Sequence, residues 1–209
     1  GASQLNVMAF DFESLNLTEI IRLQNQLSAL LARRFEKTLA LAFSDVTGST
    51  AYFARFGNEA GRRLQQRHVD LIVKSLEGSS GRIVDTVGDG VFLCFPQVET
   101  AVEVLSGFQT LRLQENSHLP PEHHMTTRIG IHWGTVLTDG VIVTGDPVNL
   151  CAKFAATGQP TEIRITKPAF LELTVQRRLR CQPIGPVKVA GVQEPMEMFT
   201  FSWADPARS

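Results

Sequence analysis

Two segments of this chain place an aspartate between an apolar run and a turn of small residues. In Phe43–Thr50, read as FSDVTGST, Asp45 follows an apolar run and precedes a Thr-Gly-Ser-Thr turn. Asp89 lies in a Gly-Asp-Gly turn between the β-rich runs 82–87 and 91–95, which is the pattern of a hairpin. Either aspartate alone is ordinary, because the first could cap a helix and the second could belong to a turn. If the strands are neighbours, both carboxylates meet at one edge of a sheet.

Paired carboxylates at such an edge favour a metal-dependent phosphate site. Two carboxylates held together repel each other unless a cation lies between them. Mg²⁺ or Mn²⁺ suits this place, because oxygen ligands and substrate phosphates complete its shell. The small residues after Asp45 lead into a helix start, which offers free N–H groups and a positive dipole end. We therefore predict that Asp45 and Asp89 hold two divalent ions over a phosphate-bearing substrate.

The order of periodic segments predicts the fold class. The first part reads as a strand at 39–45, helices at 50–56 and 59–76, and the hairpin that carries Asp89. The pattern then predicts helices at 98–113, 147–156 and 168–173, and strands at 125–132, 135–143, 162–166, 179–189 and 196–201. This order contains β-α-β-β-α-β, so we predict an α+β fold with a ferredoxin-like core and added strands and helices.

A helix at 17–34 precedes this core. It carries a narrow apolar stripe, formed by Ile20, Leu23, Leu27 and Leu30. Asn16 or Thr18 is placed to cap its start. The stripe either packs on its own domain or pairs with its twin in a dimer. We expect a segment 1–36 that supports a dimer, a catalytic domain at 37–204 and a tail at 205–209.

Composition limits the partners and the compartment. The formal net charge is -1, which gives no bulk electrostatic reason to expect nucleic-acid binding. No apolar run approaches the ~20 residues of a membrane span, and no signal peptide is visible. The three cysteines show no Cys-x-x-Cys spacing. We expect a cytoplasmic protein that does not insert into membranes and does not bind nucleic acid.

Over most of its length the chain resembles the class III nucleotidyl cyclases, the adenylate/guanylate cyclase catalytic domain family. The resemblance is carried by four segments in the family's order: Phe43–Thr50, Thr86–Gly90, Arg128–Gly134 and Gly145–Leu150. It implies that a nucleoside triphosphate is converted into a 3′,5′-cyclic monophosphate and pyrophosphate. It also implies a homodimer with its active sites at a head-to-tail interface.

The resemblance assigns roles to individual residues. Asp45 and Asp89 are implied ligands of two Mg²⁺ or Mn²⁺ ions, with the Val46 carbonyl as an added ligand. Arg128 matches the arginine that binds the triphosphate, and Asn149 matches the asparagine that orients the ribose and the transition state. The main chain that holds the β- and γ-phosphates is Val46, Thr47, Gly48, Ser49 and Thr50. The metal ligands and Arg128 come from one subunit, and Asn149 and the base pocket come from the other.

Four positions depart from the family pattern. Asp85 stands where adenylate cyclases place a lysine, and Ile142 stands where they place an aspartate. Lys153 stands where the family has a transition-state arginine, and it lacks the planar fork of that side chain. The family's triphosphate lysine aligns with Ala190, but Lys188 lies two residues earlier, on the same predicted strand face, and can substitute for it.

The base pocket is informative about the substrate. An ionised Asp85 only accepts hydrogen bonds, and adenine N1 also only accepts, so Asp85 suits guanine, uracil or cytosine. Guanylate cyclases carry a glutamate at the Asp85 position, usually with a cysteine where this chain has Ile142. One polar anchor and one apolar wall favour a smaller base. The chain is similar to the bacterial pyrimidine cyclases of antiphage signalling, which implies cyclic UMP or cyclic CMP as product and a separate effector protein.

Two alternatives remain beside the pyrimidine hypothesis. One is a guanylate or adenylate cyclase. The other is a degenerate cyclase domain that senses a nucleotide without turnover, and the replacement at Lys153 is the observation that favours it.

Overall fold

The structure, a computed structural model, describes residues 10–204. The chain separates into a first unit that ends at Glu36 and a second that begins at Lys37, and each is described by itself. The predicted tail at 205–209 lies outside the described residues. Within residues 10–204, no helix combines the length and the apolar character needed to cross a membrane.

The first unit consists of a short 3₁₀ helix, η1 (Phe12–Ser14), and one long helix, α1 (Leu17–Phe35). Asn16 caps α1, because its side chain accepts a hydrogen bond of 2.9 Å from the main-chain N–H of Glu19. This confirms the predicted helix and selects one of its two candidate caps. None of the residues of α1 is buried. Its apolar stripe is therefore a surface within this unit.

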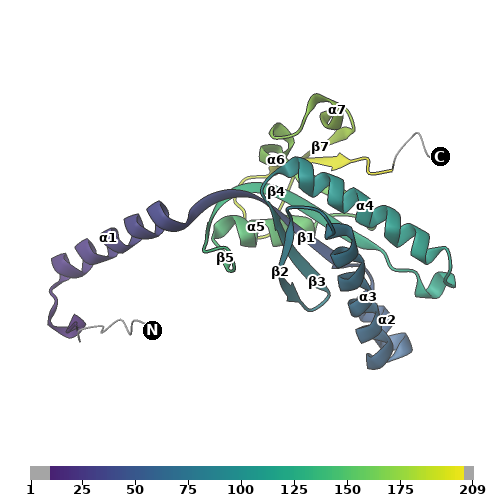
Figure 1. Cartoon of the computed structure of the whole chain (residues 1–209), viewed down its shortest axis with the longest axis horizontal. Coiled ribbons are helices and arrows are strands. Elements are labelled where there is room, and N and C mark those ends of the chain that lie inside the picture. The colour runs from purple at the N-terminus through teal and green to yellow at the C-terminus, as the bar shows by residue number, and fades with distance from the viewer. Residues whose placement is uncertain (1–9, 205–209) are drawn as a thin grey trace. The chain divides into compact units, whose positions relative to one another are not determined.

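The second unit is a mixed sheet with helices on both faces (Figure 1). Its strands are β1 (Glu36–Val46), β2 (Arg82–Val87), β3 (Gly90–Phe95), β4 (Thr127–Thr138), β5 (Val143–Thr144), β6 (Ile163–Thr166), β7 (Cys181–Val187) and β8 (Met196–Phe201). Its helices are α2 (Ser49–Phe56), α3 (Asn58–Leu76), α4 (Val98–Asn116), η2 (Pro121–His123), α5 (Asp146–Ala155), α6 (Lys167–Leu171) and α7 (Val175–Arg178).

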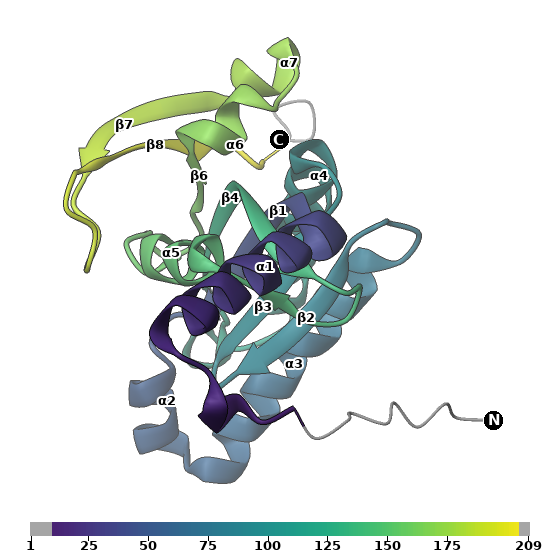
Figure 2. The same cartoon turned by 90° about the vertical axis from the view of Figure 1, so that its left-hand side faces the viewer.

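The sheet has the order β2-β3-β1-β4-β6-β8-β7, and β5 pairs with β4. The segment from β1 to β4 runs β-α-α-β-β-α-β, and its hairpin strand β3 lies antiparallel beside β1. This is the ferredoxin-like arrangement, so the predicted fold class is confirmed. β7 and β8 extend this core as a long two-stranded ribbon (Figure 2).

The two faces of the sheet are covered differently. Alternate residues of β1, such as Ala40 and Ala42, belong to the core formed with α3 and α4. The intervening residues, such as Leu39 and Leu41, belong to a second core formed with α5. Figure 1 shows α3 and α4 on one side of the sheet and α5 on the other. Because side chains alternate along a strand, Asp45 is on the face of α5.

Two predicted boundaries are wrong. The expected strands at 125–132 and 135–143 are instead one continuous strand, β4, followed by a turn and the two-residue β5. Gly134 does not break β4. It allows close packing instead, because a Cβ there would lie 2.7 Å from the Cβ of Pro147 on α5. The expected strand at 179–189 is shorter, since β7 ends at Val187.

Candidate active site

The turn after β1 brings a helix start beside Asp45. Gly48 adopts φ +69°, a left-handed conformation that favours glycine, and α2 begins at the next residue. The main-chain N–H of Thr47 donates to the carbonyl of Thr126 at 2.9 Å, which ties the turn to the segment before β4. The first N–H groups of α2 have no partner within the helix. The turn thus has the form that phosphate binding requires.

Asp45 lies against an arginine from β4. Its carboxylate is 3.4 Å from Nη2 of Arg128, whose Nη1 donates to the carbonyl of Ala156 at 2.9 Å. Burial raises the pKa of Asp45 above its usual range. The charge and hydrogen bond of Arg128 oppose this rise in the pKa, and the nearby carboxylate of Asp89 adds to it. Arg128 therefore joins the metal-ligand candidate Asp45 to the C-terminal end of α5.

Asp89 reaches the same edge of the sheet from the neighbouring strand. In the antiparallel pairing of β1 with β3, Asp45 is opposite Gly90, directly after Asp89. The Asp89 carboxylate accepts hydrogen bonds from Ser49 Oγ at 2.5 Å and from Gln65 Nε2 at 2.6 Å. The structure thus brings together the two predicted aspartates, Arg128 and the turn. The sequence analysis predicted neither the hydrogen bond from the Ser49 side chain to Asp89 nor any part of the site from Gln65.

A buried pair lies on the opposite face of β1. Ser44 Oγ and His68 Nε2 are 2.8 Å apart, and His68 is 1% exposed. Burial lowers the pKa of His68 to about 4, so the ring is neutral at pH 7. A sequence signal for this residue does exist. His68 interrupts the buried stripe of α3 that contains Leu64 and Leu71, where an apolar residue would be expected.

Asp85 is turned toward the face of Asp45 by a β-bulge. Ile83 pairs with Leu93 on the face covered by α3 and α4. Asp85 pairs with Phe92, which lies on the other face, that of α5. Phe43 stacks on Phe92 with ring centroids 4.8 Å apart. Asp85 is exposed, and one of its carboxylate oxygens accepts from the N–H of the next residue at 2.8 Å.

Ile142 lies in an exposed turn between β4 and β5. Its side chain is 63% exposed, and the carboxylate of Asp139 shapes the turn by accepting from the N–H groups of Val141 and Ile142 at 2.9 Å each. Arg82 Nη1, at the start of β2, donates to the carbonyl of Val141 at 3.2 Å. This bond connects the turn of Ile142 with β2, the strand of Asp85.

Asn149 and Lys153 form a separate group on α5. They are four residues apart, both exposed, and on the face of the helix that points away from the buried Cys151 and Phe154. They line a surface depression of about 410 Å³. The loop between β7 and β8 closes it, and a Cβ on Gly191 of that loop would lie 2.9 Å from Lys153 Nζ.

Lys188 does not lie on a strand. β7 ends at Val187, so the argument from strand alternation does not apply to Lys188 and Ala190. Both residues are nevertheless exposed on either side of the buried Val189.

The donor set is compatible with divalent cations. Within residues 10–204, no group of three or more His, Cys, Asp or Glu side chains is placed to hold a metal ion. The available oxygen atoms are the carboxylates of Asp45 and Asp89 and nearby carbonyls such as that of Val46. Mg²⁺ is usually bound by one or two carboxylates together with waters and substrate phosphates. The two aspartates therefore fit a site that is completed by its substrate.

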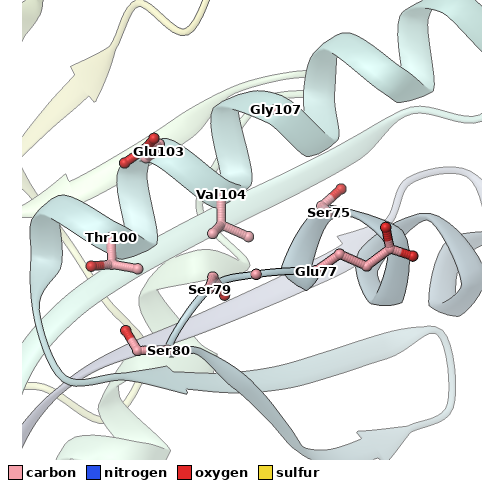
Figure 3. Close-up of a pocket in the computed structure, with 9 residues that line it drawn as sticks. Ser75, Glu77, Ser79, Ser80, Thr100, Glu103, Val104 and Gly107 are labelled. Carbon is pink, nitrogen blue, oxygen red and sulfur yellow. The ribbon is translucent and has the colours of Figure 1, made fainter.

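A different depression, of about 500 Å³, lies between the end of α3 and α4 (Figure 3). Its charged lining residues are Glu77 and Glu103, and the rest are small, hydroxyl or apolar residues. A triphosphate requires positive charge or free N–H groups, so this lining does not suit it.

The comparisons with known proteins show the family of this chain. The sequence profile described as "Adenylate and Guanylate cyclase catalytic domain" matches residues 32–202. The chain belongs to this family. It is 26% identical over 151 residues to an adenylate cyclase of Streptomyces coelicolor, covering 68% of this chain and 36% of that protein. The relatives it matches are longer, and the chain spans between 20% and 36% of their length.

Solved structures of the family share the fold. The adenylyl cyclase CyaB from P. aeruginosa matches with a TM-score of 0.66 at 23% identity, covering 82% of this chain and 96% of that one. The guanylate cyclase domain of RhGC from Catenaria anguillulae, solved in complex with GTP, matches with a TM-score of 0.67 at 18% identity, covering 80% and 97%. At these identities the similarity shows the fold.

Proposed function

We propose that this chain is a nucleotidyl cyclase that converts a nucleoside triphosphate into a 3′,5′-cyclic monophosphate and pyrophosphate. The observation that carries the proposal is the group formed by Asp45, Asp89 and Arg128 at the start of α2, in a chain of the cyclase family. Two carboxylates beside a helix N-terminus and an arginine match what a triphosphate with its metal ions needs.

The reaction forms a bond between the ribose 3′-oxygen and the α-phosphorus. It breaks the bond from that phosphorus to the oxygen of the β-phosphate, pyrophosphate leaves with the electron pair, and the proton of the 3′-hydroxyl passes to solvent. Two Mg²⁺ or Mn²⁺ ions, held by Asp45, Asp89 and the Val46 carbonyl, would neutralise phosphate charge and activate the attacking oxygen.

The chain's own groups bind and orient the triphosphate. The N–H groups of Gly48, Ser49 and Thr50 receive the β- and γ-phosphates, whereas those of Val46 and Thr47 donate to the carbonyls of Asp89 and Thr126. Arg128 offers a planar set of donors, which suits phosphate oxygens better than a point charge does. Asn149 orients the ribose, Lys153 supplies positive charge near the reacting phosphate, and Lys188 contributes charge from the exposed segment after β7. The role of Asn149 follows the family pattern, whereas Lys153 and Lys188 would take over the roles of family residues that this chain lacks.

We propose that two copies of the chain complete each site. Among the described residues, no hydrogen bond or ion pair joins Asn149 or Lys153 to Asp45 or Asp89. A head-to-tail homodimer would bring Asn149 of a second copy over the aspartates of the first and form two equivalent sites. The exposed apolar stripe of α1 is suited to pairing with its copy in the same dimer.

We propose a pyrimidine nucleotide, UTP or CTP, as the substrate. The support is an exposed acceptor, Asp85, on the same face as Asp45, linked through β2 to the apolar Ile142. Uracil N3–H and cytosine N4–H₂ can donate to Asp85, whereas adenine N1 cannot. Guanine can donate as well, so GTP is the second candidate. The resemblance to the bacterial pyrimidine cyclases of antiphage signalling extends this proposal: the cyclic product would signal to a separate effector protein in the cytoplasm, in antiviral defence.

The test is incubation of the purified protein with Mn²⁺ and ATP, GTP, CTP or UTP separately, with products identified by mass. A cyclic pyrimidine product supports the whole proposal. A cyclic purine product alone contradicts the pyrimidine assignment and leaves the cyclase assignment standing. The Asp45→Asn variant is the control, because it removes a proposed metal ligand without changing the size of the side chain.

A degenerate nucleotide sensor is the second candidate function, favoured by Lys153 in place of the family arginine. Nucleotide binding measured by calorimetry, without product from any of the four substrates, would support it and contradict the cyclase proposal.

A further inference from the structure

The residues on either side of Asp89 offer no side chains that could hold its carboxylate. Gly88, which adopts φ +56°, and Gly90 flank it, and glycine has no side chain to pack. The side chain of Asp89 is nevertheless held at both of its oxygens. Ser49 at the start of α2 donates to Oδ2 at 2.5 Å, and Gln65 on α3 donates to Oδ1 at 2.6 Å.

The bond from Gln65 is supported by a second contact of α3, with β1, the strand that pairs with β3. His68 follows Gln65 by three residues, so both project from the same side of the helix. Its buried imidazole is hydrogen-bonded to Ser44 on β1, with 2.8 Å between Nε2 and Oγ. α3 is therefore held against β1 about one helical turn from Gln65, which helps to fix the position from which Gln65 donates.

The two donors leave room for a cation. An ionised carboxylate has about four lone-pair positions on its two oxygens, and Ser49 and Gln65 each use one. The remaining positions are available to a cation, and Asp45 lies on the neighbouring strand opposite Gly90, the residue after Asp89. Groups that orient a metal-binding carboxylate in this way typically change metal affinity by about 10- to 100-fold when they are removed.

We propose that Gln65 is a positioning residue that orients the Asp89 carboxylate for the divalent cation. This inference rests on the proposed metal-dependent function. It adds a residue from α3, a helix to which neither the sequence pattern nor the family resemblance assigns a role in the site. Gln65 does not touch the substrate in this scheme and acts through Asp89.

The test compares Gln65→Met with Gln66→Met. Methionine is also unbranched and similar in length to glutamine, but it donates no hydrogen bond. Gln66 is the matched control because it is the next residue on α3, is exposed, and donates to Asp70 at 2.8 Å instead of to Asp89. Binding of Mn²⁺ to the full chain without nucleotide is measured by electron paramagnetic resonance of the free ion, and thermal unfolding is recorded for each variant.

We expect Gln65→Met to weaken Mn²⁺ binding by about 10- to 100-fold and Gln66→Met to leave it unchanged. A merely structural role would lower the unfolding temperature of Gln65→Met without changing its Mn²⁺ affinity, and that result would overturn the inference. Equal loss in both variants, or no Mn²⁺ binding by the unaltered chain, would also overturn it.

The outcome is separable from that of the proposed function. If the unaltered chain makes a cyclic nucleotide and Gln65→Met binds Mn²⁺ normally, the inference fails and the cyclase proposal stands. If no substrate is turned over but Gln65→Met loses Mn²⁺ affinity, the positioning role stands and the domain binds metal without catalysis.

Discussion

The residues assigned to the metal and the triphosphate differ from those assigned to the base and the ribose in how they are held. Asp45, Asp89 and Arg128 are linked through hydrogen bonds or close charges to elements on both sides of the sheet. Asp85, Ile142, Asn149, Lys153 and Lys188 are all exposed and have few contacts. A group that is already ordered loses little conformational freedom when it binds a ligand. The first group is thus prepared within one chain, whereas the second is arranged as surfaces that a second copy can complete.

Removing one carboxylate from the prepared group should have the largest effect. We expect Asp45→Asn or Asp89→Asn to lower turnover by at least about 1000-fold, because an amide cannot replace a charged metal ligand. Product formation is measured by mass, and light scattering should show an unchanged oligomeric state. Asp70→Asn makes the same chemical change at an exposed position of α3 and should keep full activity. Full activity in either ligand variant would contradict the metal assignment.

The second group can be tested by mixing two inactive variants. Asp45→Asn and Asn149→Ala damage opposite halves of a shared site, so a mixed dimer contains one intact site and one with both changes. Random exchange at equal concentration makes about half of the dimers mixed, so about a quarter of the original activity should return. A mixture that stays inactive after subunit exchange, shown by a labelled subunit, would place both residues in the site of one chain.

Asp85 should control which base is accepted, with little effect on the group formed by Asp45, Asp89 and Arg128. Asp85→Lys replaces an acceptor by a donor, so the ratio of activity with ATP to activity with UTP or CTP should rise by about 10- to 100-fold. Mn²⁺ affinity should stay the same. Glu59→Lys, an identical charge change at an exposed position of α3, is the control. An unchanged ratio of activities would remove Asp85 from the base pocket.

The same difference explains how much the sequence could predict. The strand, aspartate and turn around Asp45 are one local pattern, and the hairpin around Asp89 is another, so both were predicted and found. Gln65 was missed because its partner is 24 residues away and glutamine has no periodic signal of its own. The orientation of Asp85 depends on a β-bulge. Simple alternation from Ile83 would have turned Asp85 toward α3 and α4 instead of toward α5. The break predicted between the strands 125–132 and 135–143 was wrong because a glycine that allows close packing, such as Gly134, and one that makes a turn look alike in sequence.

The packing beneath α5, which carries Asn149 and Lys153, should depend on pH. His132 on β4 lies beneath this helix, 6% exposed, with its ring centroid 6.2 Å from that of Phe154 and Nδ1 2.8 Å from Thr166 Oγ1. Burial lowers the pKa of His132 to about 4. The unfolded chain therefore takes up a proton near pH 6.5, before the folded chain does, and the free energy of unfolding falls as the pH drops from about 6.5 to 4.

The contribution of this one histidine to that fall should be about 3 kcal/mol. His132→Gln keeps a polar partner for Thr166 but cannot titrate, so its unfolding free energy should fall less between pH 7.5 and 4.5, as measured by urea unfolding at both pH values. The buried His68 titrates in the same direction and remains in the variant, so part of the loss will persist. An equal fall in the variant and the unaltered chain would show that the environment of His132 does not oppose protonation.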